Sequence, residues 1–418
     1  MSDSSPVMAA DGRPLKASLN RALRRQKLRA LMLIAPLLVF VLVTFIAPIG
    51  DMLFRSVEND IVSETLPRTV IALEDWDATS GVSPDETVFA ALAADLGEAV
   101  AAKRHTQLGA RLNYELSGMS SLFRKTGRSV KKLDAEAAYK PQFLDIEEDW
   151  DDPQIWTTIK ANSSRYTAGY FLNAVDLQNG PEGIEVRPEN QRIYVKLFGR
   201  TIFLSVTITL SCFLLGYPIA FLLANLKVRT SNLLMILVLL PFWTSLLVRT
   251  SAWKVLLQQQ GVINDTLVWI GIVADDNRLE LINNQTGTII AMTHILLPFM
   301  ILPLFSVMKT IPISFVRAAK SLGATNWTAF WRVYFPQSVP GIGAGAILVF
   351  ILAIGYYITP ALVGGTSGTF ISNRIAYHIS SSLNWGLGAA LGAILLVLVL
   401  ALYALYDKIV GIDNVKLG

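Results

Sequence analysis

Long apolar runs recur along this chain of 418 residues. Four runs contain no Asp, Glu, Lys or Arg, and two further apolar runs follow them; the six cover residues 30–50, 201–226, 230–248, 281–308, 339–363 and 387–406. A helix needs about 20 apolar residues to cross the hydrocarbon core of a bilayer. The pattern therefore predicts an all-α integral membrane protein with six transmembrane helices, at about 31–50, 201–226, 230–249, 286–308, 339–363 and 387–406.

The composition supports this fold class. Hydrophobic residues make up 52% of the chain and charged residues 16%, whereas soluble globular proteins carry about 25% charged residues. The single cysteine, Cys212, lies within an apolar run and excludes a disulfide framework inside the chain.

The distribution of charge predicts the orientation. The first 30 residues form a basic tail with seven Lys or Arg against two acidic residues, and such a tail beside an apolar run is typical of the cytoplasmic side, although a nucleic-acid-binding arm has a similar composition. Because the first run is long and Ala47 precedes Pro48, we expect a retained anchor and not a cleaved signal peptide. Alternation then places both termini in the cytoplasm. The short loops that fall on that side are basic, with Lys227, Arg229, Lys309, Arg317, Lys320 and Arg332.

A large insert separates the first two apolar runs. It is expected outside the membrane on the extracytoplasmic face, and residues 55–196 hold 23 of the 32 acidic residues against 16 Lys or Arg. In the segment SPDETVFAALAADLGEAVAAKR, Ser83 is a candidate N-cap with Glu86 three residues later, and Val88, Leu92, Leu96 and Val100 repeat at helical spacing. The acidic segment DIEEDWDDPQIW is compatible with a cation site but is more typical of a solvated loop before a helix. We expect a small, mainly helical cap.

A second extracytoplasmic segment is expected between the third and fourth transmembrane helices. Its apolar part, 267–273, is too short to cross a bilayer. We expect an interfacial helix there, anchored by Trp253 and Trp269.

The stretch SFVRAAKSLGATNWTAFWRVYFPQSVPGI interrupts the apolar pattern between the fourth and fifth transmembrane helices. Ser314 is a candidate cap for a short helix whose apolar face is Phe315, Ala318, Ala319 and Leu322, and Gly323 suits the left-handed conformation that ends a helix. Thr325 or Asn326 then begins a second helix, which Pro336 is expected to stop. By amphipathicity alone, this loop is equally compatible with a linker that rests on lipid headgroups.

The same stretch resembles the cytoplasmic signature loop of ATP-binding-cassette (ABC) importer permeases, in which Glu-Ala-Ala is followed three residues later by Gly and further on by Leu-Pro. Ala318, Ala319, Gly323 and Pro336 match, while Arg317 stands at the position of the Glu and Phe335 at that of the Leu. The segments LPFWTSLLVRTSAWKVLLQQQGVIN and YYITPALVGG are similar to the permeases for spermidine and putrescine. The resemblance covers the second to sixth transmembrane helices and not the insert.

This resemblance implies a transport subunit and not an enzyme. The loop at 310–338 would be the coupling loop that docks on a separate ATPase, with Arg317, Ala318, Ala319, Gly323, Ala324 and Pro336 as its coupling residues. The implied partners are a dimer of ABC ATPases, a second permease subunit and an extracytoplasmic solute-binding protein. The chain lacks the G-x-x-x-x-G-K-[ST] pattern of a nucleotide-binding loop. We therefore expect no cofactor in this chain, with ATP and Mg bound by the ATPase partners, and no metal site or catalytic residue.

The solute path needs polar or aromatic groups at membrane depth. The candidates are Trp243, Thr244, Tyr356, Tyr357 and Thr359, whose aromatic members can attract an amine through cation–π interactions or can serve as interfacial anchors. His294 is the one ionisable candidate for a proton relay but is more typical of a packing histidine. Arg249 would repel a polyamine, which favours a structural or docking role. The Gly341/Gly345 and Gly388/Gly392 pairs permit close helix packing.

The resulting hypothesis is an inner-membrane permease subunit that moves a small solute, a polyamine by resemblance, into the cytoplasm by alternating access. Two other classes remain open on the residues alone: a secondary carrier without an ATPase, and a membrane-anchored receptor whose insert senses a ligand. The expected organisation is a basic tail at 1–30, a first transmembrane helix at 31–54, an insert at 55–196 and a five-helix core at 197–418.

Overall fold

The computed structural model describes residues 15–180 and 183–410. It divides into two units, 1–55 and 56–418. The first part of the predicted basic tail, residues 1–14, lies outside the described residues.

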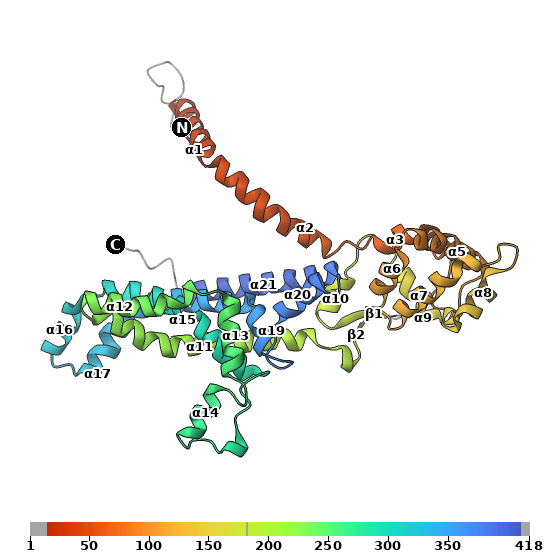
Figure 1. Cartoon of the computed structure of the whole chain (residues 1–418). Helices are drawn as coiled ribbons and strands as arrows, with labels where there is room; N and C mark the ends of the chain where they lie inside the picture. Colours follow the sequence, from red (N-terminus) through yellow and green to blue (C-terminus); the bar gives the residue numbers. More distant parts are fainter. Residues whose placement is uncertain (1–14, 181–182, 411–418) are drawn as a thin grey trace. The chain divides into compact units, whose positions relative to one another are not determined.

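The described part of the first unit, residues 15–55, is one long helix. It consists of α1 (Leu15–Val41), a π-helical turn (Leu42–Ile46) and α2 (Ala47–Arg55) (Figure 1). Its segment Leu23–Arg55 is long and apolar enough to cross a membrane. The predicted first transmembrane helix therefore forms as a helix, although the helix begins well before residue 31.

The second unit begins with the insert, which is mainly helical as predicted. Its α-helices are α3 (Ile61–Thr65), α4 (Pro67–Ala72), α5 (Glu86–Ala101), α6 (His105–Leu112), α7 (Met119–Ser129), α8 (Tyr139–Ile146), α9 (Pro153–Ala161) and α10 (Gly169–Ala174). A two-stranded antiparallel hairpin follows, with β1 (Leu177–Gly180) paired to β2 (Gly183–Val186) so that Leu177 lies opposite Val186. Three short 3₁₀ turns, Val130–Lys132, Glu148–Asp151 and Glu189–Gln191, complete it.

The core of the insert is built from the apolar positions that repeat along α5. Val88, Leu92 and Leu96 are buried as the periodicity predicts. The predicted N-cap is wrong, because α5 begins at Glu86 and Ser83 instead donates to Asp151 Oδ1.

The acidic segment at 145–156 contributes aromatic side chains to this core. Trp150 and Trp156 are fully buried, and Trp150 Nε1 donates to Thr126 Oγ1 at 2.9 Å. No group of His, Cys, Asp or Glu that could hold a metal ion occurs in the part of the chain that the structure describes. The segment comprises the end of α8, a 3₁₀ turn and the start of α9, and its two tryptophans pack into the core.

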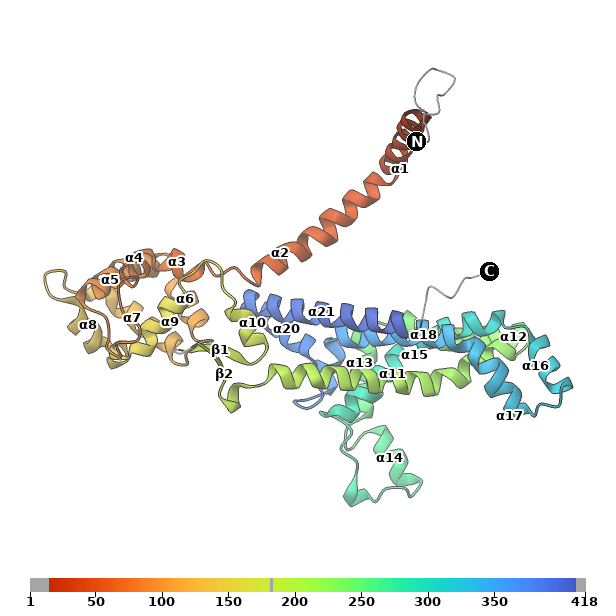
Figure 2. The same ribbon diagram turned by 180° about the vertical axis from the view of Figure 1, so that it is seen from behind.

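The remaining α-helices form the membrane core and its loops: α11 (Tyr194–Asn225), α12 (Val228–Leu239), α13 (Leu246–Leu256), α14 (Val262–Trp269), α15 (Gln285–Thr310), α16 (Ile313–Ser321), α17 (Asn326–Ala329), α18 (Phe335–Gly355), α19 (Ile358–Val363), α20 (Ile371–Ser380) and α21 (Trp385–Val410). Figures 1 and 2 show α11, α15, α18 and α21 running side by side. Over the described residues, five helices are long and apolar enough to cross a membrane, or six if a bent pair counts as one. The chain is thus a mainly helical membrane protein, with the β1–β2 hairpin in its insert.

Two predicted transmembrane helices differ from the structure. The third is broken, because Val228–Trp243 and Leu246–Leu256 meet at an angle of 96°. Pro241 lies in the 3₁₀ turn before the break, and a proline lacks the N–H that would continue the helical ladder. The fifth spans Asn326–Gly355 and not 339–363, because the backbone becomes extended at Tyr356 and α19 begins as a separate helix.

Glycines permit a close contact between the core helices α15 and α18. A Cβ atom on Gly345 would lie 2.7 Å from Met300 Sδ and 3.1 Å from Met300 O, and one on Gly341 would lie 3.2 Å from Leu304 Cα. Both neighbours belong to α15, so the prediction that Gly341 and Gly345 permit close packing is confirmed.

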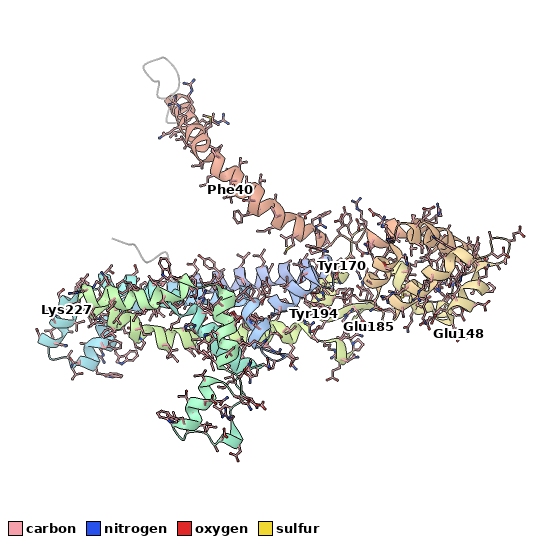
Figure 3. The ribbon with its side chains drawn as sticks, viewed as in Figure 1. Phe40, Glu148, Tyr170, Glu185, Tyr194 and Lys227 are labelled. Carbon is pink, nitrogen blue, oxygen red and sulfur yellow. The ribbon has the colours of Figure 1, made fainter. Side chains whose placement is uncertain are left out.

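The end of the insert is bonded to the start of the membrane core. The Asp176 carboxylate accepts the backbone N–H groups of Ile193, Tyr194 and Val195 at 3.1, 3.0 and 2.8 Å, which satisfies the free donors at the first turn of α11. Tyr194 and Tyr170, labelled in Figure 3, lie at this junction. A Cβ atom on Gly386 of α21 would lie 2.4 Å from the Tyr170 ring, so α10 packs tightly on α21.

A buried histidine completes the junction. His378 of α20 is bonded through Nε2 to Tyr194 Oη and through Nδ1 to Ser382 Oγ, each at 2.9 Å. The Tyr114 ring of the insert contacts its imidazole edge-on. Burial, reinforced by the Arg374 charge, lowers the pKa of His378 to about 4.

Candidate functional site

The loop at 310–338 joins α15 to α18 and carries most of the predicted site residues. It contains the two short helices α16 and α17, with Gly323 between them at φ +91°. The N–H groups of Gly323 and Ala324 donate to the carbonyls of Lys320 and Ala319, so the left-handed glycine ends α16 as predicted. Thr325 Oγ1 accepts the N–H of Thr328, which identifies Thr325 as the N-cap of α17.

Two details of the prediction for this loop are wrong. Ser314 lies inside α16, because the helix already begins at Ile313 with Pro312 as its N-cap. Pro336 does not stop the second helix; it occupies the first turn of α18, directly after a π-helical turn at Phe330–Tyr334. The missing N–H of a proline is tolerated in a first turn, so the chain runs from α17 into α18 without a break.

One apolar face of α16 is not covered by the rest of the chain. Phe315 and Ala318 are exposed, and the side chain of Leu322 is 89% exposed at the tip. Trp327 on α17 is 72% exposed. The other predicted coupling residues lie on the same loop: Arg317, Gly323 and Pro336 are exposed, and Ala319 and Ala324 are half-buried.

An aromatic cluster ties this loop to the membrane core. Phe330 contacts the rings of Tyr217 and Phe221 on α11, at centroid distances of 6.2 and 5.8 Å. Tyr334 contacts Phe221 at 5.1 Å, and Tyr217 Oη is bonded to Ser338 Oγ of α18 at 3.0 Å. These contacts join the π-helical turn after α17 to α11 and, through Tyr217, to α18.

The predicted path residues lie at two breaks in the helices. Trp243 and Thr244 are at the bend of the broken helix pair, where Trp243 is 87% exposed and Thr244 Oγ1 donates to Pro241 O. Tyr356 and Tyr357 lie between α18 and α19, where their carbonyls accept bonds from Ser372 Oγ and Asn373 Nδ2. Thr359 is fully buried, and its hydroxyl is bonded to that of Thr250 at 3.1 Å.

A polar group that sequence reasoning did not assemble lies beside these breaks. Trp253, one helical turn after Arg249 on α13, donates from Nε1 to His294 Nδ1 of α15 at 3.0 Å. The sequence pattern predicts Trp253 as an interfacial anchor and does not connect it with Arg249 or His294. The spacing of four residues between Arg249 and Trp253 was the available signal, because it places both on one face of a helix.

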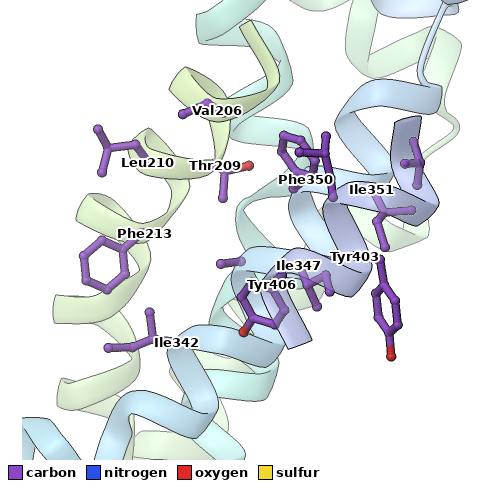
Figure 4. Close-up of a pocket in the computed structure, with 13 residues that line it drawn as sticks. Val206, Thr209, Leu210, Phe213, Ile342, Ile347, Phe350, Ile351, Tyr403 and Tyr406 are labelled. Atoms are coloured by element: carbon purple, nitrogen blue, oxygen red, sulfur yellow. The ribbon is translucent and has the colours of Figure 1, made fainter. Parts of the chain in front are cut away.

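An apolar groove on another side of the core does not suit a polar solute. It has a volume of about 380 Å³ and lies between α11, α18 and α21 (Figure 4). Thirteen residues line it: Val206, Thr209, Leu210, Phe213, Ile342, Ala346, Ile347, Phe350, Ile351, Val399, Leu402, Tyr403 and Tyr406. Since nearly all of these side chains are apolar, the groove offers a polar solute few hydrogen-bond partners.

Comparison with known proteins identifies the family. Residues 216–410 match the family described as binding-protein-dependent transport system inner membrane component. The chain is 36% identical over 216 residues to the spermidine/putrescine transport system permease protein PotB of Haemophilus influenzae, an alignment that covers 52% of this chain and 75% of that protein. It is 34% identical over 198 residues to PotB of Escherichia coli K12, with coverage of 47% and 71%.

The chain belongs to this family of ABC importer permeases. It is therefore a multi-pass inner-membrane transport subunit and not an enzyme. The inner membrane ABC transporter permease protein YdcU of E. coli K12 is 32% identical over 224 residues, with coverage of 51% and 70%. A crystal structure of a bacterial ABC transporter involved in the import of the acidic polysaccharide alginate is similar at 18% identity and a TM-score of 0.43, over 71% of this chain and 99% of that chain. The insert precedes the family match.

Proposed function

We propose that this permease subunit imports a small amine solute of the spermidine and putrescine class, driven by ATP hydrolysis on a separate pair of ATPase subunits. The observation that carries the proposal is the identity of 36% over three quarters of a permease whose name specifies spermidine and putrescine transport. A second permease subunit and an extracytoplasmic solute-binding protein complete the assembly. Both termini lie in the cytoplasm and the insert lies outside.

In this proposal the 310–338 loop is the coupling loop. Its uncovered apolar face, with Leu322 and Trp327 at the tip, suits a hydrophobic cleft on an ATPase subunit. The aromatic contacts of Phe330 with α11 then transmit the movement of the ATPases to the transmembrane helices. Arg317, at the position of the family's Glu, would meet an acidic group on the ATPase.

The proposed solute path runs past the helix breaks. Trp243, Tyr356 and Tyr357 offer aromatic faces that attract ammonium groups, and Thr244 offers a hydroxyl. Thr359 is buried, and its hydrogen bond to Thr250 holds α19 against α13 beside the path. An aromatic face attracts an ammonium group although the ring itself carries no charge. The attraction is therefore weak enough for the solute to be released.

The test is uptake by the complete importer in proteoliposomes, with radiolabelled spermidine and putrescine. We expect uptake that requires hydrolysable ATP and the solute-binding protein. Uptake that continues without ATP and collapses with the proton gradient would identify a secondary carrier. Ligand-dependent signalling without uptake would identify a receptor.

A second experiment tests the coupling loop through Gly323. A Val at this position is strained because of the φ of +91°, so it distorts the junction of α16 and α17. We expect Gly323→Val to abolish uptake and solute-stimulated ATP hydrolysis while membrane insertion is retained. Gly271→Val is the matched control, because Gly271 also has a positive φ of +77° and no neighbouring atom within 4 Å of its added Cβ, but lies outside the loop. Equal activity of the two variants would contradict the assignment.

A further inference from the structure

The cluster of Arg249, Trp253 and His294 places polar groups on a surface that this chain covers only in part. His294 is the tenth residue of the 26-residue helix α15, well inside a segment long enough to cross a membrane. Its side chain is nevertheless exposed, and those of Arg249 and Trp253 are half-buried. Because a cation and an imidazole are costly against lipid chains, this surface must face a partner or the solute path.

The cluster has hydrogen-bond donors to spare and lacks acceptors. His294 Nδ1 accepts from Trp253 Nε1, so a neutral His294 carries its proton on Nε2 and offers another donor. Arg249 Nε and Nη1 are buried and have no hydrogen-bond partner. A buried charged donor without a partner is costly, so an acceptor is expected to reach it in the assembled protein.

This chain does not supply a carboxylate to the cluster. α13 and α15, which carry the cluster, and α19, which packs against both, contain no Asp or Glu. α14 also contacts α13, but its Asp265 is paired with Arg278. Among the residues that the structure describes, Arg249 takes part in no ion pair, whereas the Arg278 guanidinium nearby in sequence pairs with two aspartates. Thr250, the residue after Arg249, is bonded to Thr359 of the proposed path, so Arg249 lies close to that path.

We propose that Arg249 and the Nε2–H of His294 bind a carboxylate from outside this chain, and that this carboxylate is an Asp or Glu side chain of the second permease subunit. The choice of source rests on the proposed function, because an unpaired cation close to the proposed path would repel an amine solute. A hydrogen bond between a guanidinium and a carboxylate is charge-assisted and directional, so the pair fixes the register of the two subunits. The pair also leaves the path without net positive charge.

The test uses the complete importer and begins without solute. Arg249→Met removes the charge and keeps most of the length of the side chain. Arg249→Lys keeps the charge but loses the planar, fixed donor geometry of the guanidinium. Lys254→Met is the matched control, since Lys254 is an exposed cation on the same helix. We expect Arg249→Met to reduce co-purification of the second permease subunit at least fivefold and to lower the melting temperature of the solute-free complex. Arg249→Lys should fall between it and the wild type, and Lys254→Met should match the wild type.

A charge exchange identifies the partner residue. Each Asp or Glu at membrane depth in the second permease subunit is changed in turn to its amide, and one such change should reproduce the loss seen with Arg249→Met. Arg249→Glu combined with Arg at that partner position should restore co-purification and spermidine uptake to within threefold of the wild type. This rescue also separates a lost pair from a failure of Arg249→Met to fold.

Three results would overturn the proposal. Wild-type assembly and uptake in Arg249→Met would show that Arg249 needs no partner. Failure of every amide change and every charge exchange would exclude an acidic partner side chain. A stable solute-free Arg249→Met complex that loses uptake of radiolabelled glutamate, carried by the wild type, would place the carboxylate on the solute. The wild type could carry neither spermidine nor putrescine while Arg249→Met still disrupts the solute-free complex. That result would support the ion pair and contradict the proposed amine substrate.

Discussion

Gly345 provides a direct test of how closely α15 and α18 pack. A methyl group there would approach the sulfur of Met300 to 2.7 Å and the carbonyl oxygen of Met300 to 3.1 Å. The sulfur lies at the end of a flexible side chain and can move, but the carbonyl belongs to the backbone of α15. Gly345→Ala therefore forces a shift of a few tenths of an ångström, and Gly345→Val adds two further methyl groups to the same space.

The expected cost follows from these distances. Overpacking costs about 1–3 kcal/mol, and replacing a helical glycine recovers about 0.5–1 kcal/mol of helix propensity. Gly345→Ala should therefore be close to neutral, and Gly345→Val should destabilise the complex by about 2 kcal/mol. A loss of that size corresponds to a decrease of roughly 4–8 °C in melting temperature for a unit of about 200 residues.

The assay is the melting temperature of the detergent-solubilised importer, followed by tryptophan fluorescence and by size-exclusion chromatography. Gly355→Ala is the control, since Gly355 ends the same helix and an added Cβ would meet no atom within 4 Å. A Gly345→Val complex that melts with the wild type would refute the close approach of Gly345 to Met300.

Three further predictions concern the insert and its junction with the core. Trp150→Ala removes a fully buried side chain and should destabilise the insert by about 3–5 kcal/mol, which limited proteolysis of the intact chain should detect as faster cleavage of the insert. Glu148→Ala, at an exposed position, should be cleaved as slowly as the wild type. Asp176→Asn removes the negative charge of the side chain that accepts three N–H groups, and should reduce the stability of the first turn of α11 by about 1 kcal/mol. Unchanged hydrogen exchange of the Tyr194 and Val195 amides would contradict this prediction. Because the pKa of His378 is lowered from 6.5 to about 4, the unfolded imidazole takes up a proton before the folded one does, so stability is full above pH 6.5 and declines as the pH falls towards 4. His378→Gln should flatten that decline in melting temperature, and an identical pH profile in the two proteins would exclude the effect.

The apolar pattern was sufficient to predict the membrane fold and the helical insert. It placed α11, α15 and α21 to within several residues, because long uncharged runs leave few alternatives to a transmembrane helix. It could not locate the break at Trp243 or the end of α18 at Gly355, because apolar residues continue through both positions. Hydropathy reports the hydrophobicity of a segment and carries little information on where its backbone bends.

The local signals in the loop at 310–338 had mixed value. Gly323 was correctly predicted in the left-handed region, since no other residue type adopts it at so little cost. The pattern predicts that Pro336 ends the second helix of the loop. A proline is also compatible with the first turn of a helix, and here the π-helical turn at Phe330–Tyr334 leads directly into α18. The contact of Trp253 with His294 joins residues 41 positions apart and has no signal in the local pattern.

The central claim is that the loop at 310–338 receives mechanical work from a separate ATPase. The most direct measurement places a single cysteine at its tip by Leu322→Cys in a Cys212→Ser background, with Val82→Cys in the insert as the comparison. Leu322 and Val82 are both exposed, at 89% and 62%. In the assembled importer, a short bifunctional thiol reagent should cross-link position 322 to the ATPase, and the yield should change when ATP binds. The same reagent should not cross-link position 82 to the ATPase. Labelling of position 322 from the outer side of the membrane by an impermeant reagent, or contact with lipid alone, would contradict the claim.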